Sequence, residues 1–398
     1  MTSIDTAETR SAAVPAEAAD FETGRVLTIS AAHGVHDTYT AFLPSLLPVF
    51  INNLALSNTR AGLLTVFLQA PSLLQPFIGH LADQLSLRYL VIFAPAVTAT
   101  MMSLLGIAPR YAALAFLLIL AGVSSAALHS VGPVMAGRLS GESLGRGMGF
   151  WMVGGELGRT LGPIVIVSAL QILTPEGTPW LMLAGLLMSG FLFVMLRDVA
   201  GRPPDAAEAL PWREAMHALR PLLGPLVGIV IARSFMVSAL TTYLPTFLSE
   251  EGTGLFLAGA SLSILQGAGV VGALVGGTLS DHLGRQAVLF ISMLATPVLM
   301  FVFLAVNGWL HVVLLLLLGV SALSVGPVIM ALVQESVPEN RALVNGIYMA
   351  LSFVLRSGVI VVIGVIGDWL SLRSAFAVSA IVALVGLPLI LLLPGGDG

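Results

Sequence analysis

The chain has 398 residues, of which 57% are hydrophobic and only 10% are charged, and its formal net charge is −4. This apolar share excludes an ordinary soluble domain, and an acidic balance with no lysine excludes nucleic acid as a partner. The chain has no cysteine, so disulfides and thiolate metal sites are excluded as well.

The first 24 residues are rich in alanine and acids, and they predict a disordered cytoplasmic tail rather than a signal peptide. After them come twelve apolar runs, each near the roughly 20 residues that a helix needs to cross the hydrocarbon. Backbone polar groups must be satisfied within lipid, so we expect helices. The runs cover residues 26–50, 59–82, 88–108, 111–137, 145–171, 179–198, 220–248, 255–280, 286–306, 309–334, 342–367 and 373–394.

The longest polar stretch between these runs, 199–219, predicts a cytoplasmic linker between two six-helix bundles at 25–198 and 220–395. Eleven arginines fall on the side of the termini and three on the other side. Positive charge concentrates in cytoplasmic loops, so both termini are expected inside. The sequence thus predicts an all-α, multi-pass protein of a bacterial inner membrane, in contact with the lipid bilayer and monomeric.

The two halves repeat each other. The loop that begins at Gly79 is matched by the loop that begins at Gly277, and Ser-Val-Gly-Pro-Val occurs at 130–134 and again at 324–328. Phe42-Leu-Pro44 in the first run likewise corresponds to Tyr243-Leu-Pro245 in the seventh. Parallel repeats of this kind are typical of secondary transporters, with the substrate site between the halves near the bilayer midplane.

The repeated loops place an aspartate near the N-terminus of a helix in the other half, where backbone amides favour an anion. We expect Asp83 to meet the helix beginning near Arg341, and Asp281 to meet the one beginning near Arg146. Such contacts would close the cytoplasmic side. In the alternative, these charges only set the topology. The residues assigned to this gate are Gly79, Asp83, Arg88, Arg146, Gly277, Asp281, Arg285 and Arg341.

Asp37 lies near the middle of the first run, where an ionisable group costs at least about 2.5 kcal/mol and is seldom idle. His33 lies four residues earlier and shares a helix face with it, and His36 is adjacent. Competition between desolvation and a nearby cation suits a proton carrier, and His129 is a further candidate relay. The alternatives are a static Asp–Arg pair and a histidine that only packs. Tyr39, two residues on, is a candidate substrate contact.

Arg159 and Arg356 occupy equivalent mid-span positions in the two halves, and Arg233 is a third cation at the same depth. A guanidinium stays charged and binds carboxylate or phosphate, so the three predict a site for an anionic substrate. Glu156, three residues before Arg159, is assigned to proton coupling. In the alternative, it pairs with Arg159 and the arginines have structural roles.

Two stripes of small residues complete the pattern. Gly154, Gly158 and Gly162 form one, and Gly269, Ala273 and Gly277 form the other. Small residues let helices approach closely, so we expect the two spans that carry these stripes to meet where the halves open and close.

These motifs resemble the major facilitator superfamily over residues 25–395. Within it the chain is similar to the fosmidomycin-resistance group of bacterial efflux proteins. That similarity rests on His33-Gly-Val-His-Asp37-Thr-Tyr39, on Ser124-Ser125 with His129, and on the Gly154–Pro163 segment. His36 replaces an asparagine of the group, and His129-Ser-Val131 replaces its His-Pro-Glu. The resemblance implies twelve helices, alternating access and drug efflux.

The sequence therefore predicts a proton-coupled exporter of a small organic compound, either an anion or a drug. The alternatives are a proton-coupled importer or exchanger of an organic anion and, more remotely, a non-transporting sensor or scaffold. No nucleotide-binding loop, metal motif or catalytic nucleophile motif is present, so no cofactor, metal or enzymatic activity is expected. The proton gradient would supply the energy.

Overall fold

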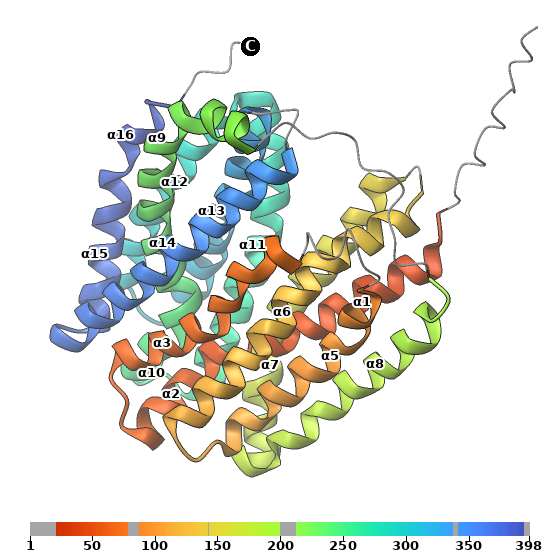
Figure 1. Cartoon of the computed structure of the whole chain (residues 1–398). Helices are drawn as coiled ribbons and strands as arrows, with labels where there is room; N and C mark the ends of the chain where they lie inside the picture. The colour runs from red at the N-terminus through yellow and green to blue at the C-terminus, as the bar shows by residue number, and fades with distance from the viewer. Residues whose placement is uncertain (1–20, 79–86, 142, 200–211, 337–340, 394–398) are drawn as a thin grey trace, which may run out of the picture.

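The computed structural model describes residues 21–78, 87–141, 143–199, 212–336 and 341–393. The described chain is helical and contains no strand, as its composition predicts. The two ends of the described chain lie at the same end of the molecule (Figure 1), which we call the terminal end. The opposite end, where α2 and α10 lie, is called the far end.

The first half forms one bundle of helices, coloured red to yellow-green in Figure 1. Its helices are α1 (Thr23–Thr40), α2 (Leu43–Leu54), α3 (Asn58–Gln69), α5 (Arg88–Ser103), α6 (Tyr111–Leu139), α7 (Leu144–Gly177) and α8 (Met182–Leu196). Short 3₁₀ turns at 70–74, 104–107 and 178–181 extend three of them.

The second half forms the other bundle, in green to blue. Its helices are α9 (Trp212–Ser238), α10 (Leu244–Glu250), α11 (Leu255–Leu283), α12 (Arg285–Ala305), α13 (Leu310–Ser336), α14 (Arg341–Trp369), α15 (Leu372–Val385) and α16 (Leu387–Ile390). Helix α9 begins at Trp212, inside the stretch 199–219 that the sequence assigned to a linker. The predicted tail, the loop carrying Gly79 and Asp83, and most of the linker lie outside the described residues.

Among the described residues, ten helical runs are long and apolar enough to cross a membrane. One of them, 146–196, contains two crossings, α7 and α8, because the chain turns at Thr174, whose φ is 57°. Helices α1 and α2 together form the first crossing, in which the histidines and Asp37 lower the hydropathy of α1. These crossings complete the two six-helix bundles.

The first helix of each bundle is broken at the same point. Helix α1 ends before Phe42 and α2 follows with Pro44 in its first turn, while α9 passes through a π-helical turn at 239–243 before Pro245. Proline has no backbone N–H, so it interrupts the hydrogen-bond ladder at both places. The sequence match at these positions therefore corresponds to a match in backbone structure.

The helices that carry the two glycine stripes, α7 and α11, meet between the halves as expected. Most glycines of the stripes also pack against a helix of their own half. A Cβ added at Gly154 or Gly158 would lie within 2.2 Å of backbone oxygens of α1. One added at Gly269 of the second stripe, or at the neighbouring Gly272 or Gly276, would strike α13, whereas one added at Gly277 would meet nothing within 4 Å. Close approach of two helices needs a partner backbone, and the helix beside each stripe within the same bundle supplies it. The stripes thus stiffen each half.

The described contacts between the halves concentrate toward the far end. Asp368 on α14 accepts hydrogen bonds from the backbone N–H groups of Asn58 (2.6 Å) and Thr59 (3.0 Å), and also from the Thr59 hydroxyl (2.6 Å). These residues form the first turn of α3, where unpaired amides favour an anion. Nearer the middle, the Ile164 N–H donates to Ser263 across α7 and α11 (3.1 Å).

Candidate functional site

Helices α1 and α6 bring His33, Asp37 and His129 together in the first half. The His33 Nε2 atom lies 3.4 Å from Asp37 Oδ2, and the His129 Nε2 atom lies 3.5 Å from Asp37 Oδ1. The two Nε2 atoms are 3.2 Å apart. The side chains of His33 and Asp37 are only 5% and 4% exposed, while that of His129 is 30% exposed. We call these three residues the His–Asp cluster.

Backbone carbonyls fix the orientation of both imidazoles. The His33 Nδ1 atom lies 2.9 Å from the carbonyl oxygen of Trp151 on α7, and the His129 Nδ1 atom lies 2.9 Å from that of Ser125. The indole of Trp151 also stacks on His33, with ring centroids 3.8 Å apart. A carbonyl oxygen only accepts hydrogen bonds, so both Nδ1 atoms carry the hydrogen.

This arrangement requires a cation within the cluster. A neutral imidazole with hydrogen on Nδ1 presents a bare lone pair at Nε2, and an ionised carboxylate only accepts. Two such nitrogens and a carboxylate facing one another at 3.2–3.5 Å would repel unless a positive charge lies among them. The cluster is therefore built to hold a proton or another small cation.

His36 and Tyr39 lie on the same helix but do not join this cluster. Both ring nitrogens of His36 are buried without a hydrogen-bond partner among the described residues, and its ring centroid is 5.7 Å from that of His129. The Tyr39 hydroxyl donates to the carbonyl of Leu181 in the same half. That contact occupies the only donor of Tyr39 in this conformation, and its assignment to substrate stays a prediction.

Arg159 and Glu156 form an ion pair on α7, as their spacing allows. The pair is half-buried, and the charge of Arg159 acts on both Asp37 and His129. Glu156 is thus engaged with Arg159 and makes no described hydrogen bond to the His–Asp cluster. The ion pair within one helix, which the sequence offered as an alternative, is therefore present. It leaves the Arg159 side chain 41% exposed.

The second half contributes two guanidiniums without a described acidic partner. Arg356 Nη2 donates to the hydroxyl of Thr241, 2.9 Å away in the π-helical turn. The Nε atoms of Arg356 and Arg233 are buried and have no hydrogen-bond partner among the described residues. The charges of Arg233 and Arg159 both act on Arg356, so the three cations lie around one region. Buried donors left unpaired are costly, which favours an anionic ligand there.

The residues assigned to the gate are engaged within their own halves. Arg285 binds Asp281 (2.6 Å) and Glu335 (2.7 Å), and Arg88 donates to the carbonyl of Arg197 (2.6 Å). The guanidinium of Arg146 lies over the ring of Phe21, 4.5 Å from its centroid. Asp83 and Gly79 fall outside the described residues, as does the side chain of Arg341. The expected contacts with the opposite half stay a prediction for the closed cytoplasmic side.

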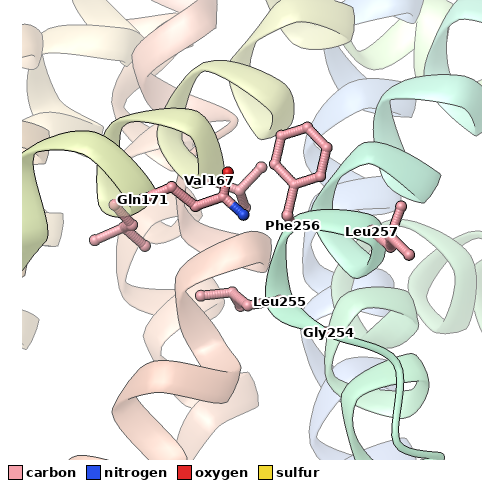
Figure 2. Close-up of a pocket in the computed structure, with 7 residues that line it drawn as sticks. Val167, Gln171, Gly254, Leu255, Phe256 and Leu257 are labelled. Atoms are coloured by element: carbon pink, nitrogen blue, oxygen red, sulfur yellow. The ribbon is translucent and has the colours of Figure 1, made fainter.

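A separate groove of about 390 Å³ lies between the halves, where α7 meets the start of α11. Figure 2 shows Gln171 and Phe256 at its wall. The other lining residues are apolar or glycine: Val167, Leu170, Gly254, Leu255 and Leu257. Val167 lies about 12 Å along the helix from Arg159. The groove thus contains none of the charged residues considered above.

Sequence reasoning missed four residues of these sites: Ser125, Trp151, Thr241 and Asp368. Trp151 and Ser125 act through backbone carbonyls, which no side-chain pattern reveals. Thr241 is a single hydroxyl in a span. Asp368 could have been found from the sequence, since it is an acidic residue at the end of the apolar run 342–367.

A bundle pair of this architecture, with buried charges at its centre, defines a secondary membrane transporter. The family model of the Major Facilitator Superfamily matches residues 29–360, and the chain belongs to this superfamily. The resemblance seen in the sequence is thereby confirmed at the level of the superfamily.

Similar proteins cover nearly the whole chain. The Fosmidomycin resistance protein of Escherichia coli (strain K12) is 25% identical over 374 residues, which are 90% of each chain. Among solved structures, a bacterial homolog of the human lysosomal transporter Spinster, inward-facing and occupied, has a TM-score of 0.77 at 12% identity, covering 94% of this chain and 97% of that one. A D-xylose-proton symporter has a TM-score of 0.68 at 18% identity, covering 94% and 97%.

Proposed function

We propose that the protein is a proton-coupled exporter of a small organic anion from the cytoplasm, working by alternating access. The observation that carries this proposal is the His–Asp cluster, in which acceptor atoms of three side chains converge and demand a cation. A proton is a cation that imidazole nitrogens bind and that a transporter can take from the transmembrane gradient. The positive-inside distribution of arginines assigns the terminal end to the cytoplasm.

The cluster supports proton carriage through its exposure as well as its geometry. Asp37 and His33 are buried, while His129 is 30% exposed and offers a route to water. The described contacts between the halves lie toward the far end, which supports the terminal end as the entrance in this conformation. A proton arriving from outside in the opposite conformation would leave here through His129.

The three arginines support an anionic substrate. Arg233 and Arg356 belong to the second half and Arg159 to the first, so an anion bound among them would bridge the two bundles. Guanidiniums bind carboxylate and phosphate oxygens in a fixed fork. The relative that confers fosmidomycin resistance supports export as the direction. Import or exchange of an organic anion by the same cycle is the second candidate.

The test is a proteoliposome assay that records internal pH while phosphonates, organic acids and lipophilic drugs are added. We expect proton flux with anionic compounds, and its loss in Asp37→Asn, while counterflow of the substrate without a proton gradient persists. The matched control is Asp198→Asn at an exposed acid, which should transport normally.

The outcomes separate the candidates. Proton flux opposite to that of the anion indicates export by antiport, whereas flux in the same direction indicates import. If Asp37→Asn retains both proton-driven uptake and counterflow, the cluster is not the proton carrier. If only neutral or cationic drugs elicit flux, the arginines do not bind the substrate.

A further inference from the structure

We infer that the His–Asp cluster is also a binding site for a divalent transition-metal ion of the zinc class. The ligands would be the Nε2 atoms of His33 and His129 and one carboxylate oxygen of Asp37. These donor atoms come from three side chains on two helices and all lie within 4.8 Å of one another. No metal motif in the sequence indicates this site, because His129 lies on another helix, far along the chain.

The spacing of the donor atoms fits tetrahedral coordination. With metal–nitrogen and metal–oxygen bonds of about 2.0–2.1 Å, neighbouring donors around a tetrahedral ion lie about 3.3 Å apart. The nitrogens are 3.2 Å apart, and each lies 3.4 or 3.5 Å from a carboxylate oxygen of Asp37. The two carboxylate distances are to different oxygens, Oδ2 for His33 and Oδ1 for His129. Because one donor atom from each residue already lies within 4.8 Å of the others, side-chain adjustment of Asp37 would complete three corners of the tetrahedron without movement of the backbone.

The hydrogen-bond partners that would orient the two histidine ligands are also in place. Metal-bound histidines almost always donate the other ring N–H to a carbonyl or carboxylate, which fixes the tautomer and the ring orientation. His33 does so to the carbonyl of Trp151 and His129 to that of Ser125, both at 2.9 Å. Both rings therefore direct a lone pair at the centre of the cluster.

The exposure of His129 indicates where the fourth ligand of the metal ion, and the ion itself, would reach the site. His129 is the exposed member of the cluster, so a water molecule or a ligand oxygen would complete the coordination from that side. Arg159 is the nearby cation that opposes a metal ion, and its ion pair with Glu156 offsets that charge. Two imidazoles with one carboxylate select Zn²⁺, Co²⁺, Ni²⁺ or Cu²⁺ over Mg²⁺ and Ca²⁺.

Metal binding stands on these positions alone and does not require that the protein move protons. One consequence does rest on the proposed function. A bound ion occupies the atoms that would hold the proton, so zinc would block proton-coupled transport.

The test is a titration of the full chain in detergent with Co²⁺, purified without a polyhistidine tag. Tetrahedral Co²⁺ absorbs strongly in the visible range, and we expect such a spectrum to saturate at one ion per chain and to be displaced by Zn²⁺ but not by Mg²⁺. His129→Gln and Asp37→Asn should each weaken binding more than 100-fold, beyond the roughly 10- to 100-fold loss caused by removing an outer-shell partner. His282→Gln, at an exposed histidine outside the cluster, is the matched control and should bind normally.

X-ray absorption of the zinc-loaded parent protein decides the matter even if a variant fails to fold. Two imidazoles with an additional oxygen shell support the site. No binding, a first shell with fewer than two imidazoles, or unchanged binding in a folded His129→Gln overturns it. Because the measurement needs no gradient, failure here leaves the transport assay to judge the proton proposal separately.

Discussion

The guanidinium of Arg356, in the second half, donates a hydrogen bond to the hydroxyl of Thr241 and contacts no described carboxylate. Its buried Nε remains without a partner among the described residues, as does that of Arg233. If Arg356 served only to stabilise the fold, we would expect an acidic side chain to pair with it. The unsatisfied donors are instead what a site awaiting an anionic ligand presents.

Replacement of this guanidinium should therefore affect the substrate more than the fold. A hydrogen bond to a charged group contributes about 1.5–3 kcal/mol. Arg356→Gln is thus expected to raise the KM for an anionic substrate about 10- to 100-fold. Thr241→Val, which removes the hydroxyl that orients Arg356, should give a smaller increase.

Initial rates of substrate uptake at saturating proton gradient measure this effect. A neutral compound that is also transported serves as the control, because its KM should not change. An equal change for charged and neutral compounds would show that Arg356 maintains the fold of the second half rather than charge recognition.

At the scale of the helix, α7 positions the cluster through its glycines. A Cβ at Gly158 would lie 2.2 Å from the carbonyl oxygen of Gly34 and 3.0 Å from Asp37 Cβ. The glycine therefore lets α1 approach closely enough for His33 to reach the Trp151 carbonyl. Backbone atoms cannot yield to a methyl group as a flexible side chain would.

Gly158→Ala is expected to lower the free energy of unfolding by about 1–3 kcal/mol, the usual effect of overpacking. Gly149→Ala on the same helix is the matched control, because nothing lies within 4 Å of the added Cβ. Alanine is the better helix former by about 1 kcal/mol, so this control should be neutral or stabilising. Thermal unfolding in detergent compares the two, and equal melting temperatures would contradict tight packing of α1 on α7.

The same helices show how far the sequence could go. The i, i+4 spacing predicted that His33 and Asp37 share a face, and their side chains do lie 3.4 Å apart. Buried ionisable groups also identified His129 and Arg356 as functional candidates. The meeting of His129 with Asp37 could not be derived, because it depends on the rotation of α6 about its axis. The small-residue stripes predicted that α7 and α11 meet, which they do. The packing of Gly158 on α1 and of Gly269 on α13 could not be derived, since a stripe of small residues specifies close approach and not which helix approaches.

At the scale of the whole molecule, the two bundles are held together toward the far end by Asp368. Its carboxylate caps the first turn of α3 with three hydrogen bonds of 2.6–3.0 Å. An anion at a helix N-terminus contributes about 0.3–2 kcal/mol. That energy is available only while the halves touch at this end.

Asp368→Asn should therefore shift the population away from the conformation described here, by roughly 2- to 30-fold. The chain has no cysteine, so spin labels can be placed without removing native thiols. Labels at Asn53 and Leu370 lie near the far end in opposite halves. Pulsed electron paramagnetic resonance should show that a longer distance between the two labels is more populated in the variant.

Glu251→Gln is the matched control for this experiment. Glu251 also lies near the far end, but its partner Arg373 belongs to the same half, 2.6 Å away. Loss of that pair should leave the distance distribution unchanged. An unchanged distribution in Asp368→Asn as well would mean that the cap does not contribute to closure.

The repeat is broken at the position of Asp37. With the offset that relates Phe42 to Tyr243, the second half has Ser238 there, a buried hydroxyl with no described partner. If Asp37 carries the proton as proposed, this single carboxylate sets a stoichiometry of one proton per turnover. Exchange of one inward proton for one outward monovalent anion would then move two elementary charges, so the cycle would be electrogenic. A membrane potential of 100 mV would drive it with about 4.6 kcal/mol, even without a pH difference.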